Sequence, residues 1–160
     1  MTENEYISAV RRNSQRLYLI ALSFTKSRED AEDIIQNVFL KLWNCGKPFD
    51  GESHTDKWLT AVCVNESRNF IKAPCRKRCV NLDELAEDAS FDSAQEQDIF
   101  NAVMSLPQKE CTVIHLFYYE DMSVKDIAKL LKQSESAVKT RLHRARKKLK
   151  EILGDEWINE

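Results

Sequence analysis

The chain has 160 residues, of which 42% are hydrophobic and 31% charged, with three Gly and three Pro. It is too rich in core-forming residues to be disordered, and too short for a large α/β enzyme. The scarcity of Gly and Pro favours helices joined by short connections. The formal net charge of -2 argues mildly against a polyanionic partner, because nucleic-acid-binding proteins are usually basic overall.

The charge is unevenly distributed along the chain. Residues 1–80 carry 13 basic and 10 acidic side chains, residues 81–94 carry five acids and no base, and residues 95–160 carry 11 of each. This pattern predicts two helical domains, 1–80 and 95–160, joined by an acidic linker, 81–94.

No stretch is apolar enough to cross a bilayer, and the N-terminus has no signal-peptide core. We therefore expect a cytoplasmic protein without membrane insertion. The five cysteines are odd in number and scattered, which favours reduced thiols over a disulfide framework. Cys75 and Cys79 lack a second Cys or His pair at a usual zinc spacing, so we expect no metal and no other cofactor.

Helical periodicity and capping signals recur through both parts of the chain. Thr2 with Glu5 fits a capping box, and Ser27 with Asp30 offers a second cap. No segment alternates with the period of two that strands require, so the sequence predicts an all-α fold. The expected helices cover residues 3–25, 28–43, 56–72, 93–105, 107–120, 123–132 and 134–153.

The last two expected helices form the strongest motif. A short helix, a tight turn and a longer helix, each with one apolar stripe, predict a helix-turn-helix. The second helix carries seven basic residues and no acid from position 139 to 150. A face opposite its buried stripe, suited to a DNA major groove, holds Ser136, Lys139, Thr140, His143, Arg144 and Lys147.

A second polar face lies on the helix 56–72. Its amides suit base edges, its cations suit phosphates, and Trp58 at the helix start can stack on a base or pack in the core. This face comprises Asn65, Arg68, Asn69 and Lys72, and Arg76 continues it. The pattern indicates a surface for a nucleic-acid strand.

The helix 28–43 has a different outer face. Its expected buried stripe is Ala31, Ile35, Val38, Phe39 and Leu42, whereas the opposite face places Leu40 among acids and amides. An apolar side chain in such surroundings suits contact with a protein and not with DNA.

Three segments of the chain resemble regions 2 and 4 of bacterial sigma factors of the extracytoplasmic function (ECF) group. They are DAEDIIQNVFLKLW (30–43), WLTAVCVNESRNFIK (58–72) and the region 105–149 with its VKTRLHRAR run. The resemblance covers nearly the whole chain in the family's order. It implies a non-enzymatic initiation subunit with sigma-2 and sigma-4 domains. The implied partners are core RNA polymerase, through its beta-prime clamp helices and beta flap, promoter DNA and an anti-sigma factor.

The resemblance also assigns roles to individual positions. It implies polymerase docking by Asp30, Asp33, Gln36 and Leu40. It implies recognition and opening of the minus-ten element by Trp58, Asn65, Arg68 and Asn69, with Lys72 and Arg76 on phosphates. Reading of the minus-thirty-five element falls to Lys139, Thr140, His143 and Arg144, within the face that periodicity exposes.

The chain departs from the family pattern at several positions. Lys132 and Gln133 stand where the helix-turn-helix turn usually has Gly followed by an apolar residue. Asn37 and Val38 stand where the family has an acid and Thr, respectively. Val64 and Glu66 stand where the family frequently has Arg and an apolar residue, respectively.

Two alternatives come from other classes of protein. A dimeric helix-turn-helix regulator that binds DNA without polymerase explains residues 123–153 but not the faces on the two earlier helices. A thiol or metal enzyme would use Cys75 and Cys79, but His54, His115 and His143 are all distant in sequence from these cysteines.

Overall fold

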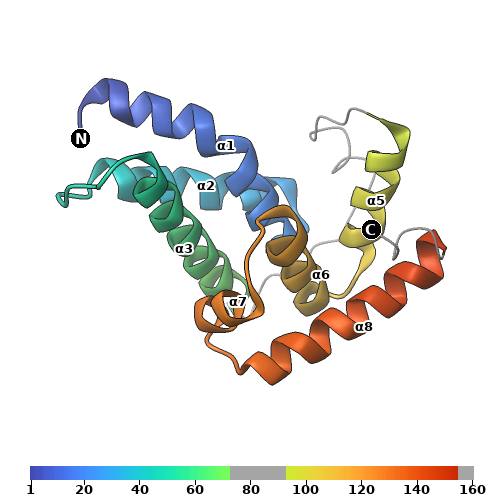
Figure 1. The fold of residues 1–160 in the computed structure, drawn as a ribbon. Coiled ribbons are helices and arrows are strands. Elements are labelled where there is room, and N and C mark those ends of the chain that lie inside the picture. The colour runs from blue at the N-terminus through green and yellow to red at the C-terminus, as the bar shows by residue number, and fades with distance from the viewer. Residues whose placement is uncertain (73–92, 155–160) are drawn as a thin grey trace. The chain divides into compact units, whose positions relative to one another are not determined.

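The computed structural model of the protein describes residues 1–72 and 93–154, and every regular element in these ranges is a helix (Figure 1). The all-α prediction is confirmed. The chain divides into two compact units, Met1–Arg78 (unit 1) and Cys79–Glu160 (unit 2). Arg76, Cys75, Cys79 and nearly all of the expected linker lie outside the described residues.

Unit 1 contains helices α1 (Glu3–Thr25), α2 (Arg28–Trp43) and α3 (Glu52–Ile71). The capping box at the start of α1 is present, with the Glu5 amide donating to Thr2 Oγ1 at 3.2 Å and the Thr2 amide donating to Glu5 Oε2 at 2.7 Å. Ser27 caps α2 by accepting from the Asp30 amide. The two capping signals expected from the sequence therefore set the N-terminal ends of α1 and α2.

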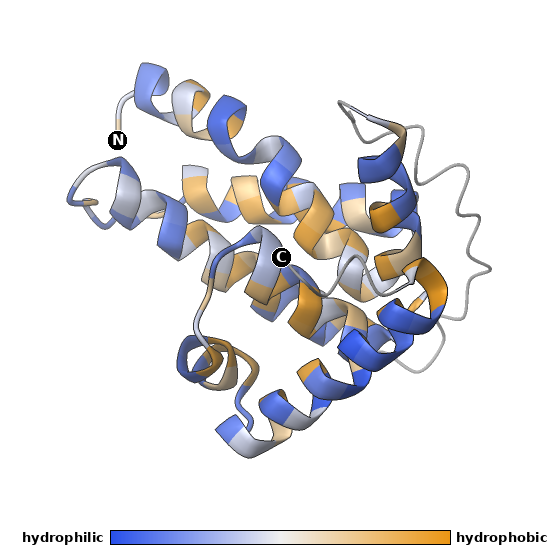
Figure 2. Cartoon of the chain, turned by 45° about the vertical axis from the view of Figure 1, so that its right-hand side comes forward, coloured by the Kyte–Doolittle hydropathy of each residue, from blue (hydrophilic) through white to orange (hydrophobic). Residues whose placement is uncertain are grey.

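The three helices of unit 1 bury one apolar stripe each (Figure 2). The stripe expected on α2 is mostly correct, but Ile35 is only half-buried and Ile34 is fully buried instead. On α3, Val64 is fully buried, whereas Val62 and Phe70 are half-buried. A three-helix unit leaves part of each helix uncovered, so spacing alone does not decide which residues at the edge of a stripe are enclosed. The principal core residues are Leu17, Ile20, Leu22, Ala31, Ile34, Val38, Leu42, Leu59, Cys63 and Val64.

Helix α3 begins at Glu52, four residues before the expected start, because Gly51 turns the chain into it. Gly51 has φ 95° and ψ -179°, a conformation that strongly favours glycine. The Thr55 hydroxyl then donates to the Gly51 carbonyl at 3.1 Å, and the Asp50 amide donates to His54 Nδ1 at 3.0 Å. These bonds organise an extra turn that has no side-chain cap at its N-terminus.

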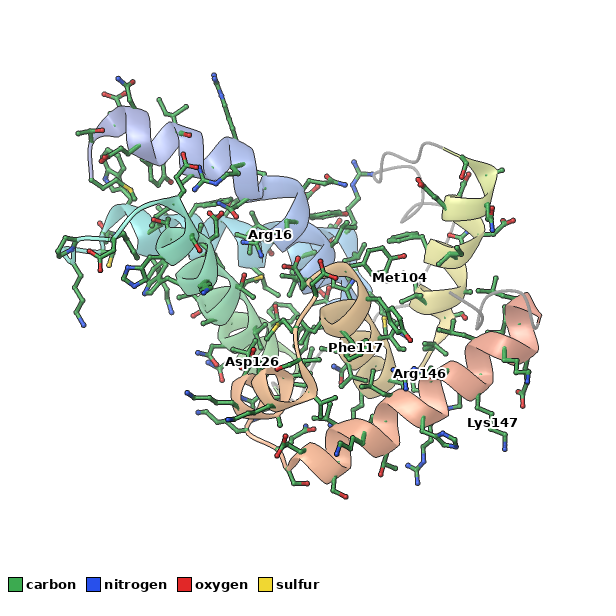
Figure 3. All side chains as sticks on the ribbon, in the orientation of Figure 1. Arg16, Met104, Phe117, Asp126, Arg146 and Lys147 are labelled. Carbon is green, nitrogen blue, oxygen red and sulfur yellow. The ribbon has the colours of Figure 1, made fainter. Side chains whose placement is uncertain are left out.

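A polar cluster around Asp56 joins α1 to α3. Arg12 donates from Nη2 and Nε to the Asp56 carboxylate, at 2.8 and 3.1 Å, and the buried Asn13 donates to it at 2.9 Å. Arg16 extends the cluster by donating to Thr60 Oγ1 at 2.6 Å and to the Asp56 carbonyl (Figure 3). Burial opposes ionisation of Asp56, but the bonds from Arg12 and Asn13 outweigh it, so the pKa of the carboxyl lies below its ordinary 3.8.

Unit 2 contains α5 (Ala94–Ser105), α6 (Gln108–Ile114), a π-helical turn η1 (His115–Tyr119), α7 (Val124–Leu131) and α8 (Glu135–Leu153). The helix expected over 107–120 is thus α-helical only to Ile114. Met104 lies in the core of this unit (Figure 3), which also includes Phe100, Val103, Leu106, Val113, Ile114, Leu116, Ile127, Leu131, Val138, Leu142, Ala145 and Leu149.

The π-helical turn holds the one histidine of the described chain that is buried. His115 is 3% exposed and stacks on the Tyr119 ring at 4.9 Å between centroids. Burial lowers the pKa of its imidazole from 6.5 to about 4. The ring is therefore neutral in the folded protein at neutral pH, as an aromatic core residue would be.

Replacing Asp56 by Asn should lower the stability of unit 1 by about 1–2 kcal/mol, because charge-assisted hydrogen bonds between α1 and α3 are lost. Urea unfolding followed by tryptophan fluorescence measures this, since Trp43 and Trp58 lie in unit 1. Glu52 is the matched control: its exposed carboxylate is 3.3 Å from Arg12, and E52Q should cost less than about 0.5 kcal/mol. Equal losses in both variants would contradict a special role for Asp56.

His115 should make unit 2 less stable in mild acid. The unfolded chain takes up the proton as pH falls through 6.5, whereas the folded imidazole resists it down to about 4, so stability is lost across that window. The full loss below the window is about 3 kcal/mol. H115F keeps the ring stack and should remove this part of the pH dependence, measured by urea unfolding with circular dichroism at pH values across the window. H143F, which leaves the buried imidazole in place, should behave as the wild type does.

Candidate functional site

The helix-turn-helix of unit 2 consists of α7, a tight turn and α8. Lys132 ends α7 in the left-handed conformation, with φ 56° and ψ 48°, and the Gln133 amide donates to the Ala128 carbonyl at 2.9 Å. Gln133 Oε1 also accepts a hydrogen bond from Arg141 of α8, and Ser134 caps α8 by accepting from the Ala137 amide at 3.1 Å. The turn geometry of a helix-turn-helix thus forms here without glycine.

One face of α8 is exposed along its length. It lies opposite the buried residues Val138, Leu142, Ala145 and Leu149. Within it, the Thr140 hydroxyl donates to the Ser136 carbonyl at 3.0 Å, and Lys147 projects away from the unit (Figure 3). The structure brings together all the residues expected on this face: Ser136, Lys139, Thr140, His143, Arg144 and Lys147.

Several of the remaining basic residues of α8 contact their own unit. A count of basic residues along the helix does not distinguish them from the exposed ones. Arg146 Nε donates to the Tyr118 hydroxyl at 2.9 Å, and its guanidinium lies 5.3 Å from the centre of the Phe117 ring (Figure 3). Lys148 pairs with the buried Glu110 of α6 at 2.7 Å. These side chains hold α8 on the unit, and the spacing of Glu110 from Lys148 gives no sequence signal for the pair.

The exposed face of α3 carries Asn65, Asn69 and Lys72 together, with Arg68 half-buried beside them. Trp58 is also half-buried, and its ring meets that of Phe49 edge to face at 5.5 Å. The two interpretations of this tryptophan, core residue and base-contacting residue, are therefore combined in one partly exposed ring.

The exposed face of α2 brings together Asp33, Gln36 and Leu40, and Leu40 is 57% exposed. Asp30 does not join them: it is 3% exposed, because the first turn of α2 directs it to the covered side of the helix. Trp43 is 58% exposed and continues the face beyond Leu40. Its spacing of three residues from Leu40 is the signal that places it there.

Sequence reasoning treated Glu66 only as a departure from a pattern. In the structure it forms an ion pair with Lys41, which joins α3 to α2. No group of three or more His, Cys, Asp or Glu suited to a metal occurs within residues 1–72 and 93–154. The helices described in these ranges include none that is long and apolar enough to span a membrane.

Comparison with known families accounts for both units. Residues 9–77 match the family described as Sigma-70 region 2, and residues 96–149 match Sigma-70, region 4. The chain belongs to the sigma factors of RNA polymerase. The ECF RNA polymerase sigma-E factor of Haemophilus influenzae is 32% identical over 138 residues, which cover 75% of this chain and 72% of that protein. The sigma factor SigV of Bacillus subtilis is 26% identical over 155 residues, which cover 96% of this chain and 93% of that one. The ECF grouping expected from the motifs is confirmed.

Two solved structures share the sigma factor's fold. The sigma factor RpoE of Bartonella quintana, in complex with the anti-sigma factor NepR, has a TM-score of 0.68 at 21% identity and matches 93% of this chain and 96% of that one. CnrH, in complex with the cytosolic domain of CnrY, has a TM-score of 0.63 at 25% identity, with 95% and 89% of the two chains covered. Both likenesses extend over nearly the whole of the chain.

Replacing Lys132 by Gly should raise the stability of unit 2 by about 0.5–1 kcal/mol, because a left-handed residue with a Cβ is strained and glycine is not. The measurement is urea unfolding followed by circular dichroism. K129G, one turn earlier inside α7, is the matched control and should lower stability by about 1 kcal/mol. A comparable loss in K132G would show that this position gains nothing from glycine.

Proposed function

We propose that this sigma factor divides its work among three helical faces. The face of α2 docks on core RNA polymerase, α8 reads the minus-thirty-five element, and α3 holds the opened minus-ten strand. The observation that carries the proposal is that each of these three helices, all within the two matched regions, exposes one face whose chemistry suits the partner assigned to it.

The face of α8 suits a DNA major groove. Ser136 and Thr140 stand near the N-terminal end of the helix, where a recognition helix meets base edges, and Lys139, Arg144 and Lys147 are exposed beside or behind them. Lys and Arg can donate to guanine edges or to phosphates, whereas Arg146 is already engaged with Tyr118. Base reading is thus assigned to the part of this face from Ser136 to Arg144, and backbone contact to Lys147 behind it.

The face of α3 suits an unpaired strand. Asn65 and Asn69 lie one turn apart and present amides that can donate to and accept from a base edge, while Lys72 offers a cation to the backbone. The partly exposed Trp58 ring supplies a stacking or wedging surface at the other end of the helix. Arg68 and Arg76 complete the assignment made from the family resemblance.

The face of α2 suits a protein partner. Leu40 is a largely exposed apolar side chain on the same face as Asp33 and Gln36, a small apolar centre with a polar rim. The carboxylate of Asp33 disfavours DNA at this face. Asp30 is assigned an indirect part, because its buried position supports the start of α2 and does not present its carboxylate to the partner.

On this proposal the chain supplies binding surfaces and the polymerase forms the nucleotide bonds. The sigma factor then acts in the cytoplasm, where the polymerase and its template are. The structural neighbour RpoE, which is described with the anti-sigma factor NepR, supports an anti-sigma factor as a further partner of this chain.

The experiment is reconstitution of the full chain with core RNA polymerase of its source bacterium, followed by transcription of that bacterium's genomic DNA and sequencing of the transcript starts. We expect starts that depend on the added chain and share two upstream elements. A dimeric regulator without polymerase docking would add no new starts and would shift promoter fragments in a gel without polymerase.

Two variants separate the polymerase-docking and minus-thirty-five surfaces. D33R should weaken binding to core polymerase by about tenfold or more, because a buried interfacial charge is reversed. K139A/R144A should leave polymerase binding unchanged and lower run-off transcription, at about 1–3 kcal/mol for each lost base contact. Mutating the minus-thirty-five element of the promoter should lower run-off transcription by this double variant less than it lowers transcription by the wild type. The assignment of surfaces is wrong if D33R affects only promoter binding or K139A/R144A affects only polymerase binding.

A further inference from the structure

The ion pair between Lys41 and Glu66 stands at the seam between two of the proposed surfaces. Glu66 lies three residues before Asn69, so their side chains are neighbours on α3. Lys41 follows Leu40 directly on α2. The lysine side chain is 55% exposed and the glutamate side chain 21%, so both remain close to solvent and to any strand lying on α3.

Glu66 is out of place for a surface that holds a DNA strand. The other charged residues described from Asn65 to the end of this face are Arg68 and Lys72, both cationic. An unpaired carboxylate beside Asn69 would repel the phosphates of a strand bound there, since like charges at such separations are only partly screened. The ammonium of Lys41 cancels that charge.

We propose that Lys41 neutralises Glu66 at the edge of the minus-ten surface, the exposed face of α3 with Asn65, Asn69 and Lys72, so that a DNA strand can lie on α3 despite the acid. This inference rests on the proposed role of α3 in holding the opened strand. Lys41 is on this account a positioning residue for charge: it acts on the promoter through Glu66 and makes no contact with DNA.

A purely mechanical role for the pair is less well supported. Exposed ion pairs contribute little to stability, and α2 and α3 are already joined through the apolar core that includes Val38, Leu42 and Leu59. Losing the pair should therefore leave the unit folded and change mainly the electrostatic potential next to Asn69.

The test measures the lifetime of the open promoter complex, using the full chain, core polymerase and the strongest promoter found by transcript-start sequencing. K41Q should shorten the lifetime by about three- to tenfold, as expected for one uncompensated charge near a phosphate. E66Q should match or exceed the wild type, and K41Q/E66Q should restore the wild-type lifetime. Raising the salt concentration should narrow the gap between K41Q and the wild type.

Two controls accompany the test. R28Q removes one cation from the exposed Arg28–Glu32 pair at the start of the same helix and should leave the lifetime unchanged. Thermal unfolding of each variant, followed by circular dichroism, should show no loss of stability large enough to explain a shortened lifetime.

Each remaining result overturns the inference. If K41Q and K41Q/E66Q are equally impaired while E66Q is normal, Lys41 contacts the DNA itself. If all three variants are equally impaired, the pair is a mechanical tie between the helices. If K41Q behaves as R28Q does, the charge of Glu66 has no effect on the strand.

N69A distinguishes failure of this inference from failure of the proposed function. A shortened open-complex lifetime in N69A with any of the three overturning results removes only the role of Lys41. An unchanged lifetime in N69A removes the minus-ten surface itself, and the inference with it.

Discussion

The geometry of unit 1 depends on the hydrogen bonds that the Asp56 carboxylate accepts. The carboxylate accepts from Arg12 and Asn13 on α1, and the backbone carbonyl of Asp56 accepts from Arg16. Asp56 sits in the second turn of α3, directly before the segment that carries Trp58, and its bonds fix the rotation of α3 about its axis. That rotation sends Leu59 and Cys63 into the core, and it exposes Asn65 and Asn69. The face of α3 proposed to hold the opened strand is thus set by a hydrogen-bond cluster at the other end of the helix.

The near-neutral total charge of the chain conceals a division of labour. The exposed face of α8 is cationic, the exposed face of α2 is acidic and amide-rich around an apolar side chain, and α3 combines amides with cations. A sum of -2 is what a protein with both a nucleic-acid partner and a protein partner can show, because the two surfaces need opposite charge. Net charge is therefore a poor guide for a chain that shares its DNA affinity with a larger assembly.

Features with local causes were predictable from the sequence. The caps at Thr2 and Ser27, the apolar stripes and the exposed face of α8 follow from residue types and spacing within a single helix. The extra turn of α3 was missed because it depends on the backbone of Gly51. The π-helical turn at His115 was also missed. The burial of Asp30 and the pairs of Glu110 with Lys148 and of Glu66 with Lys41 depend on what another helix places opposite. Arg76 and the linker remain predictions, as do the partner contacts of every proposed site residue.

The basic run of α8 also bears on how DNA binding should respond to counterions. Of its seven Lys and Arg residues from 139 to 150, Arg141, Arg146 and Lys148 already contact Gln133, Tyr118 and Glu110. A cation that stays with its own unit releases no counterion from DNA. If Lys139, Arg144 and Lys147 each neutralise one phosphate, they contribute about -3 to the slope of the logarithm of the binding constant against the logarithm of the salt concentration. This is about half of what all seven residues would contribute. The recognition helix then binds more weakly, but also less dependently on ionic strength, than its sequence alone implies.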